Sequence, residues 1–434
     1  MQCTRTPTAV FVMVLSLQLS LTWMAISAGR IYTSDSNEYF RLAKNLFEHG
    51  VWYCGELDYE TDPSLYSRRP PGYSAFLFLS SMGLRFPLLA LIFQSLLHAL
   101  SAVLTWKILS QGFGIQLRAF SMGAIWLLMP SSWIYAQVYM SETLLQFLLV
   151  SGVFYLLKFN TTKNKHFFWI GHLMLLLAWL TKPVAIFCWI PVVIWQAVHG
   201  TFKVRRTALV AAAIHIVLIT ATLIRNEQQT GVTELSSVGR KLLINYTLPS
   251  ILAIHHDDAF AKNQVVHFQE SLNGLTYAES CTKSDSLIRK VITEKPLATC
   301  WAYFKGAVSF LVDPGRWDLE MRLGSIESNP SFQHQGYRAT WLSRPIWYWT
   351  IWLCSIIGAL LILLLIIIGI QRDAKNPGLR RVLITWIIWF ILATGPSASA
   401  RFRVPVFPFL IVLAAPGLTQ VAKRSPIRIT LNPC

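Results

Sequence analysis

The feature that most constrains this chain is a series of long apolar stretches. A helix that crosses a bilayer needs about 20 mostly apolar residues. Stretches close to this length run over 8–28, 87–109, 116–132, 140–157, 166–181, 183–198, 207–224, 345–370, 381–395 and 404–420. Apolar residues make up 54% of the chain and charged residues only 14%, so a soluble fold could not bury the apolar surface. We therefore predict an all-α polytopic membrane protein with about ten transmembrane helices.

Three features of this apolar pattern need separate interpretation. The first stretch has a long apolar core and no clean small-residue cleavage site, so we expect a retained helix rather than a signal peptide. The two stretches that meet at Thr181-Lys182-Pro183 are either two short helices or one broken helix. Segment 72–84 is too short to span, and we expect it to re-enter the membrane or lie at its surface.

The basic residues orient these helices. The chain carries 38 Lys and Arg against 21 Asp and Glu, a net charge of +17. With the N-terminus in the cytoplasm, the basic loops fall on the cytoplasmic side, as the positive-inside rule requires. These loops contain Lys107, Arg118, Lys158, Lys163, Lys165, Lys203, Arg205, Arg206, Arg372, Lys375, Arg380, Arg381, Lys423, Arg424 and Arg428. The charge therefore predicts topology, with the lipid bilayer and no nucleic acid as a partner.

This topology divides the chain into three parts. We expect an N-terminal transmembrane module over 1–224, an extracytoplasmic domain over 225–344 and a C-terminal transmembrane module over 345–434. The first outer loop, about 29–86, belongs to the N-terminal module, and the extracytoplasmic domain is long enough for a small mixed fold. A Cys281–Cys300 disulfide is conceivable there, because both residues would face an oxidising compartment.

The first outer loop begins with an amphipathic helix. Apolar residues recur at spacings of three and four from Tyr39 to Phe47, and Gly50 suits the end of the helix. Spacing alone favours Asp35 as the N-cap, with Glu38 three residues later as in a capping box. A carboxylate just outside the membrane is also placed to act as a general base on a lipid-borne substrate. Both interpretations of Asp35 stay open on this evidence.

Two arginines follow about thirty residues later along the same loop. Arg68 and Arg69 precede Pro70-Pro71, a rigid turn that would hold them at the height of lipid headgroups. A guanidinium group donates two parallel hydrogen bonds to a phosphate, so these residues suit a lipid-linked phosphate substrate. The alternative is an ordinary interfacial role, in which the side chains extend toward bulk phospholipid.

Several motifs, taken in order, resemble GT-C glycosyltransferases, which are polytopic enzymes that use polyprenyl-phosphate sugars. The chain looks closest to the set related to protein O-mannosyltransferases and the aminoarabinose transferase of lipid A. The matching segments are Asp35-Ser-x-x-Tyr39…Ala43-x-Asn45-Leu46…Gly50, Arg69-Pro70-Pro71-Gly72-Tyr73, Ser141-Glu142-Thr143, Thr181-Lys182-Pro183, Ile224-Arg225-Asn226…Gly231 with Ser236-Ser237…Gly239, and Ala400-Arg401-Phe402-Arg403-Val404-Pro405-Val406-Phe407-Pro408. Together they cover most of 29–240 and then 395–415.

The chain also departs from the family pattern. Family members often carry a second acidic residue just before the basic-Pro-Pro step, where this chain has Arg68. Lys182 stands where the family more often has Arg, which keeps the charge but loses the guanidinium fork. Segment 241–344 has no recognisable match.

The resemblance implies roles for individual residues. Asp35 would be the general base that deprotonates the acceptor as it attacks the anomeric carbon, with inversion of that centre. Arg69 is the first candidate to hold the phosphate leaving group, because preorganised cations stabilise such charge. The further substrate-binding candidates are Glu38, Tyr39, Arg68, Lys182, Arg225, Arg401 and Arg403.

Metal and nucleotide sites have weaker support in the sequence. His255-His256-Asp257-Asp258 has the residue types of a metal site, but four consecutive residues rarely converge on one ion. We interpret this cluster as a solvated loop and predict no metal or other cofactor. The absence of a Gly-rich phosphate loop argues against a soluble nucleotide-sugar donor. Glu142 is as consistent with a helix-dipole interaction as with substrate contact.

The rival interpretations are a transporter or flippase, an O-antigen ligase-like protein that handles lipid-linked sugars, and a non-catalytic assembly protein. Transporters typically show internal repeats and charges near the bilayer midplane, whereas the polar residues here gather near span ends. We therefore expect a glycosyltransferase that moves a sugar from an undecaprenyl or dolichyl phosphate to a glycan, lipid or protein acceptor. In a bacterium it would lie in the inner membrane with its active site facing the periplasm, and in a eukaryote it would face the ER lumen.

Overall fold

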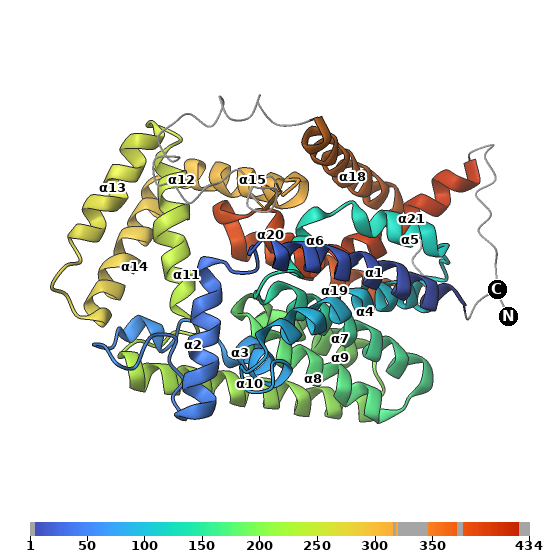
Figure 1. Cartoon of the computed structure of the whole chain (residues 1–434), viewed down its shortest axis with the longest axis horizontal. Coiled ribbons are helices and arrows are strands. Elements are labelled where there is room, and N and C mark those ends of the chain that lie inside the picture. Colours follow the sequence, from blue (N-terminus) through green and yellow to red (C-terminus); the bar gives the residue numbers. More distant parts are fainter. Residues whose placement is uncertain (1–4, 316–317, 320–345, 371–375, 425–434) are drawn as a thin grey trace.

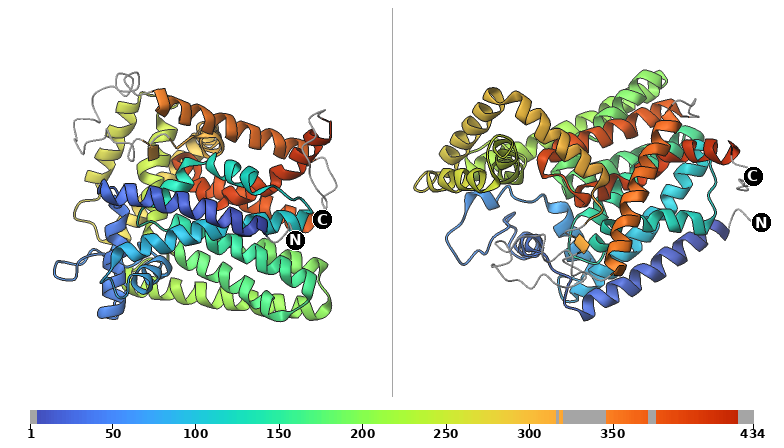
Figure 2. Two further views of the ribbon diagram at one scale, coloured as in Figure 1. Left: turned by 45° about the vertical axis from the view of Figure 1, so that its right-hand side comes forward. Right: turned by 90° about the horizontal axis from the view of Figure 1, so that it is seen from above.

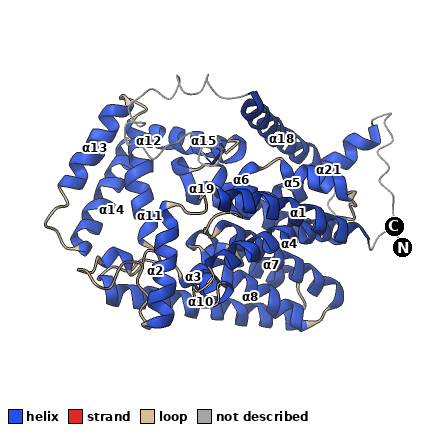
Figure 3. Cartoon of the chain, in the orientation of Figure 1, coloured by secondary structure: helices blue, strands red, loops and turns tan. Residues whose placement is uncertain are grey.

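The chain folds into helices joined by loops. A computed structural model describes residues 5–315, 318–319, 346–370 and 376–424. Within these ranges every regular element is helical and none is a strand (Figure 3). The prediction of an all-α protein is therefore confirmed for the described part of the chain.

Seven helical segments in these ranges are long and apolar enough to cross a membrane. Six are α1 (Arg5–Ser27), α4 (Pro87–Phe113), α7 (Glu142–Thr162), α10 (Phe202–Thr230), α18 (Ile346–Ile370) and α19 (Pro377–Thr394). The seventh runs from Ala400 to Val421 through α20 (Ala400–Arg403), η7 (Val404–Val406) and α21 (Phe407–Arg424). The chain is thus a multi-pass integral membrane protein.

The other three predicted spans form shorter or interrupted helices. The stretch 116–132 is broken at Pro130 into α5 (Ala119–Leu127) and α6 (Pro130–Tyr135). The stretch 166–181 forms α8 (Lys165–Thr181), which has 17 residues. The stretch 183–198 begins with a 3₁₀ turn, η3 (Pro183–Phe187), before α9 (Trp189–His199). Seven rather than ten predicted spans therefore meet the length and composition of a full crossing.

The break at Thr181-Lys182-Pro183 separates two elements. Lys182 is extended, with φ −151° and ψ 127°, because the ring of a following proline disfavours the helical conformation. The choice between two helices and one broken helix is thus settled in favour of two.

The first loop contains the predicted amphipathic helix, α2 (Ser34–Glu48), and Gly50 follows it at φ +69°. Thr33 rather than Asp35 is the residue that caps this helix, and its backbone N–H donates to Ser36 Oγ at 2.9 Å. The interpretation of Asp35 as the N-cap is therefore wrong. Its carboxylate extends from the first turn of α2, where the helix dipole favours a negative charge.

The remainder of the loop returns to the bundle through η2 (Pro63–Leu65) and α3 (Pro71–Ser80). A side chain at Gly72 would meet the carbonyl of Leu180 at 2.6 Å, so only glycine allows α3 to approach the end of α8 this closely. This contact brings the Arg69-Pro70 step next to Lys182.

Between α10 and α18 the described residues form a helical module with its own small core. Its elements are α11 (Ser237–Leu242), the π-helical turn η4 (Leu243–Thr247), α12 (Leu248–Leu252), α13 (Asp258–Glu270), α14 (Tyr277–Glu294) and α15 (Pro296–Val312). Ile244, Ile251 and Val265 are among its buried residues. The expectation of a mixed fold is wrong here, because the described part contains only helices. Cys281 is buried and Cys300 is exposed, and both are free thiols, so the conceived disulfide is not formed.

The arrangement places the module and the ends of the described chain at opposite ends of the bundle. Helices α1, α4, α7 and α10 run along one direction and α18 crosses them obliquely, with the ends of the described chain at the right of Figure 1 and α11–α14 at the left. The rotated views in Figure 2 give the same separation. The loop that carries α2 lies at the module end, which is also where α19 leads through η6 (Gly395–Ser397) into α20.

Candidate functional site

A cavity of about 530 Å³ lies where the first loop, the module and the span ends meet. Seven of the nine site residues predicted from the sequence line it: Asp35, Glu38, Tyr39, Arg68, Arg69, Lys182 and Arg401. They come from α2, the loop before α3, the α8–η3 junction and α20. Segments separated by more than 300 residues in sequence thus contribute to one site.

Asp35 is held by two arginines. Its Oδ1 lies 2.9 Å from Arg69 Nη2, and its Oδ2 accepts from Arg401 Nη2 at 2.8 Å. Burial alone would raise the pKa of this carboxyl, but the charges of Arg69 and Arg401 outweigh burial and hold the pKa well below its ordinary value of 3.8. Asp35 is therefore ionised at neutral pH, and both of its oxygens are engaged.

Arg69 is fixed from several sides. Its Nε donates to Glu38 Oε2 at 2.6 Å, and its guanidinium lies 5.0 Å from the centre of the Tyr39 ring. The Tyr39 hydroxyl is 3.0 Å from Ser141 Oγ inside the protein. Arg68 Nε approaches Glu38 Oε1 at 3.6 Å. Glu38 and Tyr39 thus hold Arg69 in position as well as lining the cavity.

Glu142 is the centre of the deeper half of the site. It is fully buried, and its Oε1 accepts from Lys182 Nζ at 2.8 Å and from Arg401 Nε at 2.5 Å. Arg401 therefore bridges Asp35 and Glu142. The sequence suggested substrate contact and a helix-dipole interaction equally for Glu142 and did not indicate this ion-pair network. The available signal was an acidic residue at the beginning of an apolar stretch, where a buried charge requires partners.

The cavity carries more positive than negative charge. Arg68, Arg69, Lys182, Arg401 and Lys241 face or line it, and the carboxylates of Asp35, Glu38 and Glu142 pair with some of them. Two cations are left in excess. A surplus of this size in a partly enclosed site favours an anionic ligand, and arginine forks match the geometry of a phosphate.

Arg225 and Arg403 lie outside the cavity lining. Arg225 donates to the backbone carbonyl of Tyr66 at 2.5 Å and to that of Trp52, so it holds the first loop. Arg403 is buried and donates to the carbonyl of Phe310 at 3.0 Å, among others at the end of α15. In this structure both residues bind backbone, and they are not brought to the other candidates.

One wall of the cavity was not predicted. It comes from α11 and η4 and contributes Val238, Gly239, Lys241, Leu242, Asn245 and Tyr246. Lys241 is exposed and makes no ion pair within the described residues, whereas Asn245 Oδ1 accepts from Gln269 Nε2 at 2.8 Å. The motif Ser236-Ser237…Gly239 reaches only the beginning of this wall, and the stretch from 241 onward matched no recognised pattern.

The His255-His256-Asp257-Asp258 segment lies on the module. Asp257 precedes α13 and its Oδ1 accepts from the N–H of Phe260 at 2.6 Å, so this carboxylate caps a helix. The ring of His256 packs 4.4 Å from the ring of Phe260. No group of three or more metal-ligating side chains occurs among the described residues.

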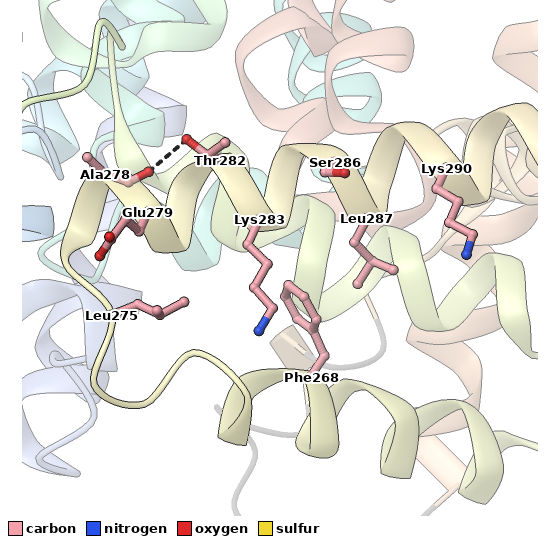
Figure 4. Close-up of a pocket in the computed structure, with 9 residues that line it drawn as sticks. All are labelled: Phe268, Leu275, Ala278, Glu279, Thr282, Lys283, Ser286, Leu287 and Lys290. Atoms are coloured by element: carbon pink, nitrogen blue, oxygen red, sulfur yellow. Dashed lines mark hydrogen bonds between the residues drawn. The ribbon is translucent and has the colours of Figure 1, made fainter.

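A second hollow, of about 740 Å³, lies between α13 and α14 (Figure 4). Phe268 projects from α13 toward Leu287 and Lys283 of α14. The charged residues that line it are Glu279, Lys283 and Lys290. Its lining is largely apolar and lacks the paired carboxylates and arginines of the cavity described above. We assign no chemistry to it.

No protein-family model matches this chain, and no curated protein is significantly similar to it in sequence. Functional inference therefore depends on the residues and geometry of the cavity.

Proposed function

We propose that this protein is a GT-C-like glycosyltransferase. It would move a sugar from a polyprenyl-phosphate donor, undecaprenyl or dolichyl, to a glycan, lipid or protein acceptor on the extracytoplasmic side of the membrane. The orientation follows from the basic loops, since they would then face the cytoplasm. In a bacterium this is the inner membrane, with the cavity toward the periplasm.

The observation that carries the proposal is the association of one carboxylate with several cations in a single cavity. Asp35 contacts Arg69 and Arg401, and Lys182 reaches the same network through Glu142. Group transfer from a sugar phosphate needs a base for the acceptor and fixed cations for the departing phosphate. The site supplies both kinds of group at a membrane protein's span ends.

In the proposed reaction Asp35 accepts the proton of the acceptor hydroxyl. The acceptor oxygen forms a bond to the anomeric carbon, while the bond from that carbon to the phosphate oxygen breaks. The phosphate leaves with the electron pair, and Arg69, Arg401 and Lys182 stabilise its charge. A single displacement of this kind inverts the anomeric centre.

The state described here fits the protein before the donor binds. Both Asp35 oxygens accept from arginines, and a carboxylate with a lowered pKa is a weak base. A donor phosphate would compete for the same guanidinium groups and release part of the carboxylate. Donor binding would then raise the pKa of Asp35 and prepare it for the acceptor.

Binding of a lipid phosphate tests the proposal directly. Purified protein in nanodiscs is titrated with undecaprenyl phosphate and with dolichyl phosphate, with the unphosphorylated polyprenols as controls. We expect saturable binding of at least one phosphate and loss of that binding in Arg69→Ala. Equal binding of the polyprenols, or equal binding by Arg69→Ala, would contradict a phosphate site here.

A further inference from the structure

Glu234 lies outside the cavity but joins its two opposite walls. It follows α10 and is 9% exposed. Its Oε1 accepts from Ser67 Oγ at 2.7 Å and from the Tyr277 hydroxyl at 2.6 Å, and its Oε2 accepts from Arg240 Nη1 at 2.5 Å. One carboxylate thus connects the first loop, the N-terminal end of α14 and α11.

Each of these partners has a defined relation to the cavity. Ser67 directly precedes Arg68 and Arg69, which line one wall. Arg240 directly precedes Lys241, which lines the other wall. A displacement of Glu234 would therefore change the separation between the arginines and the α11–η4 wall.

Neighbouring contacts extend this connection along the backbone. Ser236 Oγ donates to the carbonyl of Arg68 at 2.9 Å, and Ser237 Oγ donates to that of Ser64 at 2.8 Å. Asn226 Nδ2 donates to the carbonyl of Glu234 at 2.8 Å and connects this set of contacts to α10. Together these contacts hold the side chain of Ser67, which precedes the arginines, and the backbone that carries the arginines.

A buried carboxylate needs full pairing, because removing it from water is costly. Glu234 has three donors, and burial raises the pKa of Tyr277, so its phenol stays protonated and able to donate. An apolar contact would join the two segments at lower cost but would not fix their angle. The directional hydrogen bonds of Glu234 indicate that the angle between the first loop and α11 has to be fixed.

We propose that Glu234 is a positioning residue that sets Arg69 for the phosphate of the ligand. The proposal rests on the proposed function, since it assumes a phosphate in the cavity. Glu234 touches neither substrate nor reacting atoms. It acts through Ser67 on the Arg68–Arg69 step and through Arg240 on the α11 wall.

The test measures the affinity of purified protein in nanodiscs for undecaprenyl phosphate, together with the Tm. Ser67→Ala removes the hydrogen bond that Ser67 donates to Glu234, together with a long one of 3.5 Å to the Ser64 carbonyl, and Glu234→Gln removes the charge. Loss of hydrogen bonds of this kind corresponds to a weakening of about three- to tenfold. Asp285→Asn is the matched control. It removes the charge of the carboxylate that accepts from Arg240 Nε at 2.9 Å, and it leaves Glu234 in place.

A double-mutant cycle separates positioning from general destabilisation. If Glu234 acts through Arg69, Glu234→Gln has little further effect on affinity in an Arg69→Lys background, which keeps the positive charge, and so measurable binding, but loses the guanidinium fork. An equal loss in both backgrounds would overturn the proposal, as would wild-type affinity in Ser67→Ala. If Glu234→Gln does not fold, Ser67→Ala decides alone. Unchanged affinity in Arg69→Ala would instead overturn the phosphate site itself.

Discussion

The two walls of the cavity differ in how their polar groups are satisfied. On the wall formed by α2 and the span ends, Asp35, Arg69, Arg401, Glu142 and Lys182 form a continuous set of ion pairs. The α11–η4 wall instead presents Lys241, which is exposed and has no ion pair within the described residues, together with the amide of Asn245, which accepts from Gln269, and Tyr246.

This difference suggests separate tasks for the two walls. Paired charges hold one another in fixed positions, which is the requirement for electrostatic stabilisation of a reaction. Lys241, which has no ion pair within the described residues, is free to bind a ligand without first breaking an internal bond. We infer that the first wall performs the chemistry and that the second wall contacts the variable part of a substrate.

The largest effect is expected at Glu142. Glu142→Gln leaves Lys182 and Arg401 without their buried negative partner, which lowers the free energy of unfolding by about 3 kcal/mol. The measurement is the Tm of the purified protein. Ser151→Ala on the same helix is the control, because its buried hydroxyl has no hydrogen-bond partner within the described residues. A Glu142→Gln protein as stable as wild type would remove the structural basis of the first wall.

A smaller effect concerns pH. The pKa of Asp35 is lowered, so its stabilising contribution is present above its ordinary value and is lost as pH falls through the lowered pKa. In Arg69→Gln, Asp35 is still buried but keeps only Arg401 as an arginine partner. The pKa of Asp35 therefore rises, by about 1–3 units. The contribution of Asp35 that is lost on acidification is then smaller in the variant, and its loss is complete at a higher pH.

The Tm measured from pH 7 to pH 3 checks this shift. The control is Arg41→Gln, which removes an exposed ion pair with Glu56 in the same loop. If the Tm of Arg69→Gln falls as much as that of wild type between pH 7 and pH 3, Asp35 is not held by Arg69 in solution.

The smallest effect is expected on the second wall. Lys241→Ala removes an unpaired cation, so we expect an unchanged Tm and a loss of undecaprenyl phosphate affinity of less than tenfold. Lys262→Ala, an exposed lysine on α13, is the control. A loss at Lys241 as large as that at Arg69 would contradict the division of tasks between the walls.

The sequence predicted the first wall better than the second for a physical reason. Apolar stretches show where spans end, so Asp35, Arg69 and Arg401 could be expected at one membrane surface. Their ion pairs with Glu142 depend on the packing of distant helices and leave no local pattern. Beyond Gly239, the α11–η4 wall has neither a hydropathy signal nor a recognised motif.

The same limit explains the errors in the prediction. Hydropathy does not register the break at Pro130, and the residue type of Arg225 or Arg403 does not distinguish binding to phosphate from binding to backbone carbonyls. Capping patterns are also degenerate, since Thr33 precedes Asp35 and caps α2 in its place. In each case the local sequence allows two outcomes, and the tertiary contacts select one of them.

The role of Asp35 as the base can be measured in the reaction itself. Membranes that contain wild type or Asp35→Asn are compared by mass spectrometry of lipid-linked sugars and of glycan products, with Asp58→Asn, an exposed residue of the same loop, as the control. We predict that Asp35→Asn abolishes one product and that one polyprenyl-phosphate sugar accumulates, while the control matches wild type. Unchanged pools of donor and product, in a variant that remains folded, would contradict the role of Asp35 as the base.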